Sequence, residues 1–295
     1  CIDEFSDVDE RAWFEVLRPT LSDKSKEGSA LFLGTPRGYG NWSYNLFTKQ
    51  ETDNNWKSFK YTTLDGGQVS ANEIEQAKQD LDERTFKQEY LSDFVNYSGA
   101  IYYNFNREEN VLKEYIPSSN TIHIGVDFNL DPMSAVVSEV KQDYLYVYDE
   151  IVIYGSNTDE LVEEINNRYS GKHIFVYPDP ASKQRKTSAG GRTDLSILKN
   201  AGYNVRVRNA HPLVRDRINA VNTKLKNTKG VRTLFIANKC KNVIKSIERQ
   251  IYKEGTSLPD KENNYDHMND ALGYLIEFLY PIRTHFKPSP PKRFS

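Results

Sequence analysis

Three apolar runs in close succession decide the fold of this chain: IHIGVD at 122–127, SAVVSE at 134–139 and YLYVYDEIVI at 144–153. Only short turns separate them, which is typical of antiparallel strands that pair with their neighbours in the chain. A helix is predicted at 159–169, with Thr158 as its cap. The all-apolar run IFVY at 174–177 then indicates a central strand that is buried on both faces.

Three antiparallel strands, a helix and a parallel fourth strand make up the order of an RNase H-like sheet. The sequence that follows completes a mixed α/β domain. Its hydrophobic periodicity predicts strands at 205–207 and 233–236, and helices at 193–200, 214–226, 239–252 and 265–280. We therefore place an RNase H-like domain at 120–282. We expect the Pro-rich, basic tail at 283–295 to be disordered.

The sequence before residue 66 indicates a second, partial α/β unit. Asp3-Glu4 is predicted to end a strand, and we expect the sequence to be a piece or a processed form of a longer chain, because that strand begins before it. A helix is predicted at 10–21, a short buried strand at 30–33 and a further strand at 56–63. We assign 1–65 to this unit.

A helical subdomain and linker are predicted between the two units, at 66–119. Ser70 and Glu73 fit a capping box that begins a helix running toward Leu81, and a second helix is predicted at 83–91. The acidic stretch 106–120 has the composition of a domain boundary.

Composition excludes several classes of protein. No apolar run approaches the roughly 20 residues of a membrane span, and no signal-peptide pattern opens the chain. The two cysteines are too few for a disulfide framework or a multi-cysteine zinc site. We expect a reduced cytoplasmic setting and no membrane partner. The net charge is −2, but 183–253 carries eighteen Lys and Arg against three acids, which suggests a surface for a polyanion such as nucleic acid.

Three carboxylates lie where the predicted sheet would bring them together. Asp127 ends the first strand, Asp179 follows the fourth and Asp270 lies on the last helix. Converging carboxylates repel each other unless cations cancel their charge. Hard divalent cations such as Mg²⁺ or Mn²⁺ prefer these oxygen ligands. Two such ions about 4 Å apart can activate a water and stabilise the leaving oxygen of a phosphodiester. The implied chemistry is metal-assisted hydrolysis of nucleic acid.

Other groups are candidates for assisting this site. Asp266 lies four residues before Asp270, so both point to one side of the helix. Asp266 also suits the N-cap of that helix, and His267 suits either proton transfer, metal binding or a structural role. Glu150 and Asp131 are weaker candidates. The sequence leaves open which acid completes the metal site.

Taken together, these motifs resemble the large subunit of a tailed-phage terminase, the DNA-packaging motor. The resemblance covers about residues 1–280. It rests on Ile2-Asp3-Glu4-Phe5 (Walker B), Leu33-Gly34-Thr35-Pro36 with Gly40-Asn41 (the coupling motif), 86–94, Gly125-Val126-Asp127, Asp179-Pro180-Ala181 and Asp266–Leu272. The resemblance implies a partial RecA-like P-loop ATPase segment before an RNase H-like nuclease that cuts concatemeric double-stranded DNA.

The same resemblance implies roles for particular residues. Asp127, Asp179 and Asp270 would be the metal-binding catalytic acids, Asp3 and Glu4 the ATPase pair, and Thr35 a coupling residue. It also implies a portal protein and a small terminase subunit as partners, and action in the host bacterial cytoplasm during virion assembly. As a separate hypothesis, a loop after Asp179 guides DNA through four basic residues: Lys183, Arg185, Lys186 and Arg192.

Two departures from the family pattern keep alternatives open. No Gly-x-x-x-x-Gly-Lys-[Ser/Thr] phosphate loop occurs in the sequence, so we expect ATP to serve only the complete protein and this chain alone to lack ATPase activity. Gly273-Tyr274 stands where the family often has Arg-Tyr. The alternatives are an inactive DNA-binding prophage remnant and another RNase H-like nuclease of the resolvase or transposase type.

Overall fold

A computed structural model describes residues 1–22, 28–38, 41–95, 99–129, 131–180, 193–253 and 256–282. Among these residues seven strands form one sheet in the order β1-β7-β4-β3-β2-β5-β6. The strands are β1 (Val111–Leu112), β2 (Thr121–Asp127), β3 (Met133–Lys141), β4 (Tyr144–Ile153), β5 (His173–Pro178), β6 (Asn204–Val205) and β7 (Leu234–Ala237). β3 is antiparallel to β2 and β4, and the other pairs are parallel. The predicted RNase H-like order is confirmed.

Ten α-helices are assigned within the described ranges. They are α1 (Arg18–Thr20), α2 (Trp42–Thr48), α3 (Ala71–Asp80), α4 (Glu83–Leu91), α5 (Arg107–Asn110), α6 (Thr158–Tyr169), α7 (Asp194–Asn200), α8 (Val214–Leu225), α9 (Lys241–Arg249) and α10 (Asp266–Leu279). The predicted helices around 71–81, 83–91 and 159–169 are confirmed. The cap of α6 is Asn157, whose side chain accepts from the Glu160 NH, and not Thr158. None of the described helices has the length and apolar character that crossing a bilayer requires.

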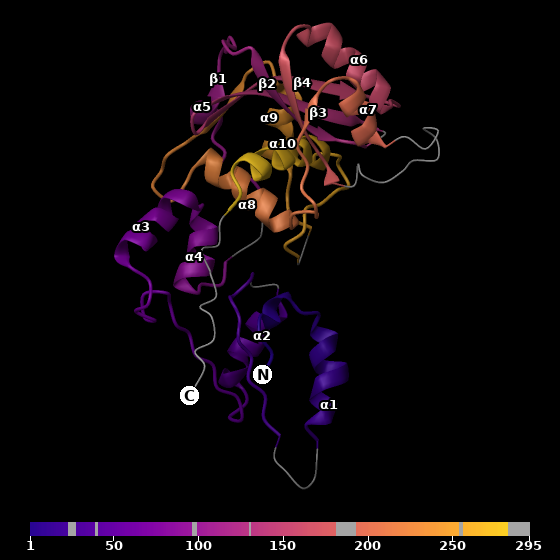
Figure 1. Cartoon of the computed structure of the whole chain (residues 1–295). Helices are drawn as coiled ribbons and strands as arrows, with labels where there is room; N and C mark the ends of the chain where they lie inside the picture. Colours follow the sequence, from indigo (N-terminus) through magenta and orange to yellow (C-terminus); the bar gives the residue numbers. More distant parts are fainter. Residues whose placement is uncertain are drawn as a thin grey trace, which may run out of the picture.

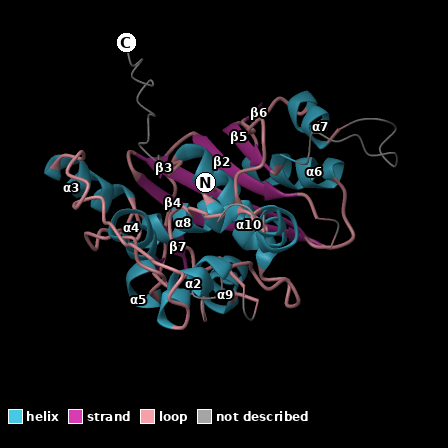
Figure 2. Ribbon diagram, turned by 90° about the horizontal axis from the view of Figure 1, so that it is seen from below, coloured by secondary structure: helices cyan, strands magenta, loops and turns pink. Residues whose placement is uncertain are grey.

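Helices cover both faces of the sheet, as two adjacent residues of β4 show. Asp149 lies 3.5 Å from Arg168 of α6, whereas the Glu150 carboxylate accepts from the backbone NH groups of Asn242 (3.0 Å) and Val243 (2.9 Å) at the start of α9. Because successive side chains of a strand point to opposite faces, α6 covers one face and α9 the other. Figure 1 shows the sheet between α6 and the group α8, α9 and α10. Figure 2 shows α10 lying across the strands.

The core of this sheet domain is one continuous apolar cluster. Ile124, Val136, Val147 and Ile236 come from four neighbouring strands, and each is completely buried. Burying one such side chain contributes roughly 1.5–3 kcal/mol. The sheet therefore provides a rigid base for the residues at its ends.

The segment expected to be a linker contributes to the sheet. β1 pairs with β7, and the fully buried Asn110 of α5 donates to the backbone carbonyls of Leu225 (3.1 Å) and Leu234 (3.0 Å). The acidic composition of 106–120 conceals this role, because the buried contacts are hydrogen bonds of an amide rather than apolar packing. The predicted boundary at 119/120 stays a prediction.

The N-terminal unit, residues 1–65, differs from the prediction in two places. At 30–33 the structure has one isolated bridge, from Phe32 to Ile2, and Leu31 and Leu33 are 56% and 47% exposed. No strand forms at 56–63, all of which is described. Trp56 stacks on Phe32 instead, and the Thr63 NH donates to the Tyr90 carbonyl. The run 30–33 pairs with the backbone only around Ile2 and Phe5, where Ile2 donates to Leu31 and both Leu33 and Phe5 continue the contact, and this pairing is too short for a strand.

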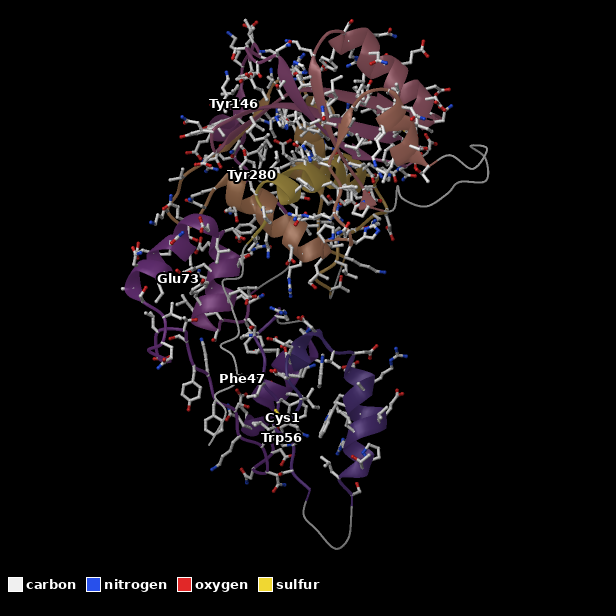
Figure 3. All side chains as sticks on the ribbon, viewed as in Figure 1. Cys1, Phe47, Trp56, Glu73, Tyr146 and Tyr280 are labelled. Atoms are coloured by element: carbon white, nitrogen blue, oxygen red, sulfur yellow. The ribbon has the colours of Figure 1, made fainter. Side chains whose placement is uncertain are left out.

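A small aromatic cluster and one ion-pair network hold the N-terminal unit. Trp13, Trp42 and Leu46 form its buried core. Arg37 binds Asp7 through two 2.8 Å hydrogen bonds and lies 3.0 Å from Glu89 of α4, and Arg215 of α8 approaches Asp7 to 3.5 Å. Figure 3 shows the N-terminal unit, with Cys1, Phe47 and Trp56 labelled, below the sheet domain.

Candidate active site at the ends of β2 and β5

Two of the predicted acids leave the sheet side by side. β2 and β5 are parallel neighbours in which Val126 is opposite Pro178. The Asp179 NH continues this pairing and donates to the Val126 carbonyl at 3.1 Å. Asp127 and Asp179 are thus the next residues at the same edge of two strands that lie about 4.8 Å apart.

Gly125 lets α10 approach this edge. A Cβ at Gly125 would lie 2.1 Å from the backbone oxygen of Ala271, which no side chain permits. The glycine thus allows the helix to pack directly on the backbone of β2. Asp270 and His267, on the adjoining turn of α10, are consequently brought to Asp127, and His267 donates from Nδ1 to Asp127 Oδ2 at 3.1 Å.

The third acid, Asp270, has an arginine as its partner. Arg217 of α8 places Nη1 2.9 Å from Asp270 Oδ1, and its guanidinium lies 4.3 Å from the centre of the Tyr274 ring. Burial raises the pKa of Asp270 above its ordinary value. The charge of Arg217 opposes this rise, and the nearby charge of Asp127 adds to it.

Tyr274 shows that the three acids share one neighbourhood. Burial raises the pKa of the Tyr274 hydroxyl, and Arg217 opposes that rise. The charges of Asp270, Asp179 and Asp127 each raise it further. All three carboxylates are therefore close enough to act on a single phenol.

Each of these acids is close to a basic side chain. Asp127 contacts His267, Asp270 contacts Arg217, and Asp179 Oδ1 lies 3.4 Å from His211 Nδ1. Within the described parts of the chain, no group of three or more His, Cys, Asp or Glu side chains is arranged to hold a metal ion. The acids converge on one site but contact basic partners rather than one another.

Asp266 and His267, at the start of α10, are both buried. Asp266 Oδ2 lies 3.3 Å from Lys261, whereas its buried Oδ1 has no hydrogen-bond partner among the described residues. The hydrogen bond to Asp127 is the main cause that raises the pKa of His267. Asp266 also raises the pKa of Asp270, as expected for two residues on one side of a helix. Its side chain makes no cap hydrogen bond in α10, where the N-cap is Tyr265.

The remaining candidates lie elsewhere. Glu150 caps α9, with both carboxylate oxygens accepting from that helix, so it serves packing in this structure and not the acidic site. Asp131 is exposed in the loop after β2. The proposed DNA-guiding residues Lys183, Arg185, Lys186 and Arg192, like the tail 283–295, lie outside the described residues.

The expected ATPase motifs lie beside each other in the N-terminal unit. Asp3 and Glu4 are exposed, and Ser6 just after them donates to the Thr35 carbonyl at 2.6 Å. Their assignment as ATPase residues stays a prediction.

Sequence reasoning did not single out Arg217 and His211. Both lie in the basic stretch 183–253, whose charge was the one available signal. Their individual partners depend on how α8 and the segment before it pack against α10 and β5.

Residues 124–278 match the sequence family described as "Terminase RNaseH-like domain". The chain belongs to this terminase family. Over 194 residues it is 29% identical to the large terminase subunit of Escherichia phage T5, a match that covers 61% of this chain and 43% of that protein. The chain thus spans less than half the length of this curated relative.

Solved structures extend the likeness of the terminase fold to nearly the whole chain. The large terminase of a thermophilic bacteriophage, in complex with ATP-gamma-S, has a TM-score of 0.71 and 18% identity, covering 94% of this chain and 69% of its own. Another crystal structure of the same phage protein has a TM-score of 0.69 and 19% identity, with coverages of 93% and 68%. At this identity the likeness concerns the fold. It includes the N-terminal unit as well as the RNase H-like sheet.

Proposed function

We propose that the RNase H-like domain is a divalent-metal-dependent endonuclease that cuts concatemeric double-stranded DNA for packaging. The observation that supports this most directly is the convergence of Asp127, Asp179 and Asp270 from two parallel strand ends and one helix. Family membership supports the same reading.

The donor set suits hard divalent cations. Asp127, Asp179 and Asp270 offer carboxylate oxygens, and the buried Asp266 Oδ1 without a hydrogen-bond partner offers another. We assign the ions, Mg²⁺ or Mn²⁺ and two in number, to the first three residues. When bound, such ions supply an activated water and charge stabilisation of the leaving oxygen.

The chain's own groups prepare this site. His267 donates to Asp127 from Nδ1 and so fixes the orientation of that carboxylate. The pairing of β2 with β5 holds Asp179 beside Asp127. Tyr274, whose ring lies under the Arg217 guanidinium, adds a neutral hydroxyl near the acids, and burial raises the pKa of that hydroxyl further above neutral pH.

Cleavage of supercoiled plasmid tests this proposal. We expect nicking and linearisation with Mg²⁺ or Mn²⁺, none with EDTA, and none for Asp127→Asn. Asp143→Asn, on the exposed turn between β3 and β4, is the matched control and should cut like the wild type. Metal-independent cutting, or full activity of Asp127→Asn, would contradict the proposal.

A DNA-binding module without cleavage is the second candidate. One observation favours it: each of the three acids contacts a basic side chain. Plasmid retardation in a gel without cutting, unchanged by Asp127→Asn, would select this alternative.

For the whole protein we propose the activities that the terminase resemblance implies. ATP would act only in the complete protein, with Asp3, Glu4 and Thr35 among its ATPase residues. The portal protein and a small terminase subunit would be its partners in the host cytoplasm. ATP hydrolysis by this chain alone, measured as phosphate release, would contradict the proposed division of labour.

A further inference from the structure

Arg217 lies in the interior of the acidic site and not at its mouth. Its side chain is 8% exposed. It extends from α8 past Gly273, where a Cβ would lie 3.5 Å from the Arg217 Cβ and 3.9 Å from Nη1. These are ordinary contact distances, so the arginine passes directly along α10 at Gly273 on its way to Asp270. A group this deeply placed is poorly located to meet DNA arriving from solvent.

The guanidinium has two neighbours, a carboxylate and a ring, and its buried Nε has no hydrogen-bond partner among the described residues. Nη1 lies 2.9 Å from Asp270 Oδ1, and the guanidinium lies over the Tyr274 ring at 4.3 Å. Both partners are on α10, one turn apart, so Arg217 connects α8 to two points of that helix. Stacking on an aromatic ring restricts an arginine to one orientation and favours its charged form.

The charge of Arg217 opposes the mutual repulsion of the acids. Asp266 lies four positions before Asp270 on the same side of α10, and His267 between them contacts Asp127. The three carboxylates therefore lie near one another, whereas the Arg217 guanidinium lies 2.9 Å from Asp270. A divalent cation bound to Asp270 would oppose the same repulsion. The arginine and the cation thus supply the same kind of stabilisation to the same carboxylate.

We propose that Arg217 is a positioning residue and the built-in counter-charge of the acidic site, which balances and orients Asp270 before a divalent cation binds. This inference rests on the proposed metal-dependent function. In this role Arg217 stabilises the site without metal. It also weakens metal binding, because the arginine and the cation are two positive charges near one carboxylate.

The test measures Mn²⁺ binding by calorimetry and Tm with and without Mn²⁺. For Arg217→Gln we expect the metal-free Tm to fall by roughly 5–10 °C, because Asp270 is left buried without its partner. We expect Mn²⁺ to bind about tenfold more tightly and to raise Tm more than in the wild type, because the competing charge is gone. Arg217→Lys keeps the charge and should retain a wild-type response to Mn²⁺.

Arg215→Gln is the matched control, because it removes an arginine from the same helix that pairs with Asp7 and not with Asp270. It should bind Mn²⁺ like the wild type. If Arg217→Gln loses stability but keeps the wild-type Mn²⁺ affinity and the wild-type increase in Tm, Arg217 serves packing alone and the inference is wrong.

A double-mutant cycle without metal separates this inference from the proposed function. Removing both charges, with Arg217→Gln and Asp270→Asn, should recover much of the Tm lost in Arg217→Gln. If Arg217→Gln does not fold, the double variant should fold. A double variant as unstable as Arg217→Gln would contradict the role of Arg217 as the counter-charge of Asp270. A wild type that binds no Mn²⁺ would overturn the metal-dependent function, while the cycle would still report on the Arg217–Asp270 pair.

Discussion

Two short apolar runs, 30–33 in the N-terminal unit and 174–177 in the sheet domain, have nearly the same character in the sequence. The second forms β5 between β2 and β6, and its Val176 is completely buried. The first makes one bridge, and Leu31 and Leu33 lie on the surface. An apolar run indicates a strand, but neighbouring strands decide whether that strand forms and is buried.

The largest expected effect would come from equal truncations in the two regions. Ile124→Ala removes a fully buried side chain from β2 and should cost about 2–5 kcal/mol of unfolding free energy. Leu33→Ala removes an exposed one and should change it by less than about 0.5 kcal/mol. Urea denaturation followed by circular dichroism measures both. Equal losses would contradict the comparison.

A smaller effect tests how closely the sheet packs against α10. Gly125→Ala should lower stability by about 1–3 kcal/mol, since its Cβ would meet a backbone oxygen that cannot turn aside. Gly273→Ala is the control, with ordinary contact distances and better helix propensity, and should be neutral or stabilising. Urea denaturation of both variants measures these changes in unfolding free energy. A neutral Gly125→Ala would show that α10 is free to shift away from β2.

The attachment of the N-terminal unit should depend on one arginine. Arg37→Gln removes the contacts with Asp7 and Glu89 and should make 1–65 more susceptible to limited proteolysis, while the sheet domain keeps its resistance. Arg11→Gln removes an exposed pair with Asp9 and should change nothing measurable. Equal digestion of wild type and Arg37→Gln would argue that the aromatic cluster alone holds the unit.

The smallest effect concerns a lysine in the sheet domain. Burial lowers the pKa of Lys224 to about 8, from 10.5. Between these values the unfolded chain keeps a proton that the folded chain has lost, so the contribution of Lys224 to stability rises as pH increases from about 8. Lys224→Met should reduce the rise in unfolding free energy between pH 8 and 9.5. The exposed Lys226→Met should leave it unchanged.

Most of the sheet domain was predictable because its elements carry their own signals. Apolar runs and short turns predicted β2 to β5, and helical periodicity predicted α6, α8 and α10. The positions of Asp127 and Asp179 at one edge were predictable because strand order places the ends of β2 and β5 together, and Asp270 was placed near them by the helical periodicity of α10. The misread strands at 30–33 and 56–63 depend on neighbours, which a local pattern does not specify.

The basic partners of the acids could not be predicted for a related reason. Arg217 and Asp270 are 53 positions apart, and their contact depends on how two helices rotate against each other. Glu150 was only a weaker candidate in the sequence, and in the structure the start of α9 takes both of its carboxylate oxygens.

The contact at Gly125 has a consequence for how the sequence of this domain can drift. Where α10 crosses β2, main chain meets main chain, so the spacing between the strand that carries Asp127 and the helix that carries Asp270 is independent of side-chain shape at that point. Core residues elsewhere can exchange one aliphatic group for another and alter stability without altering this spacing. Conservative aliphatic substitutions in the core should therefore be tolerated, whereas substitution of Gly125 should not. The relative positions of Asp127 and Asp270 should stay the same through such changes in the surrounding sequence.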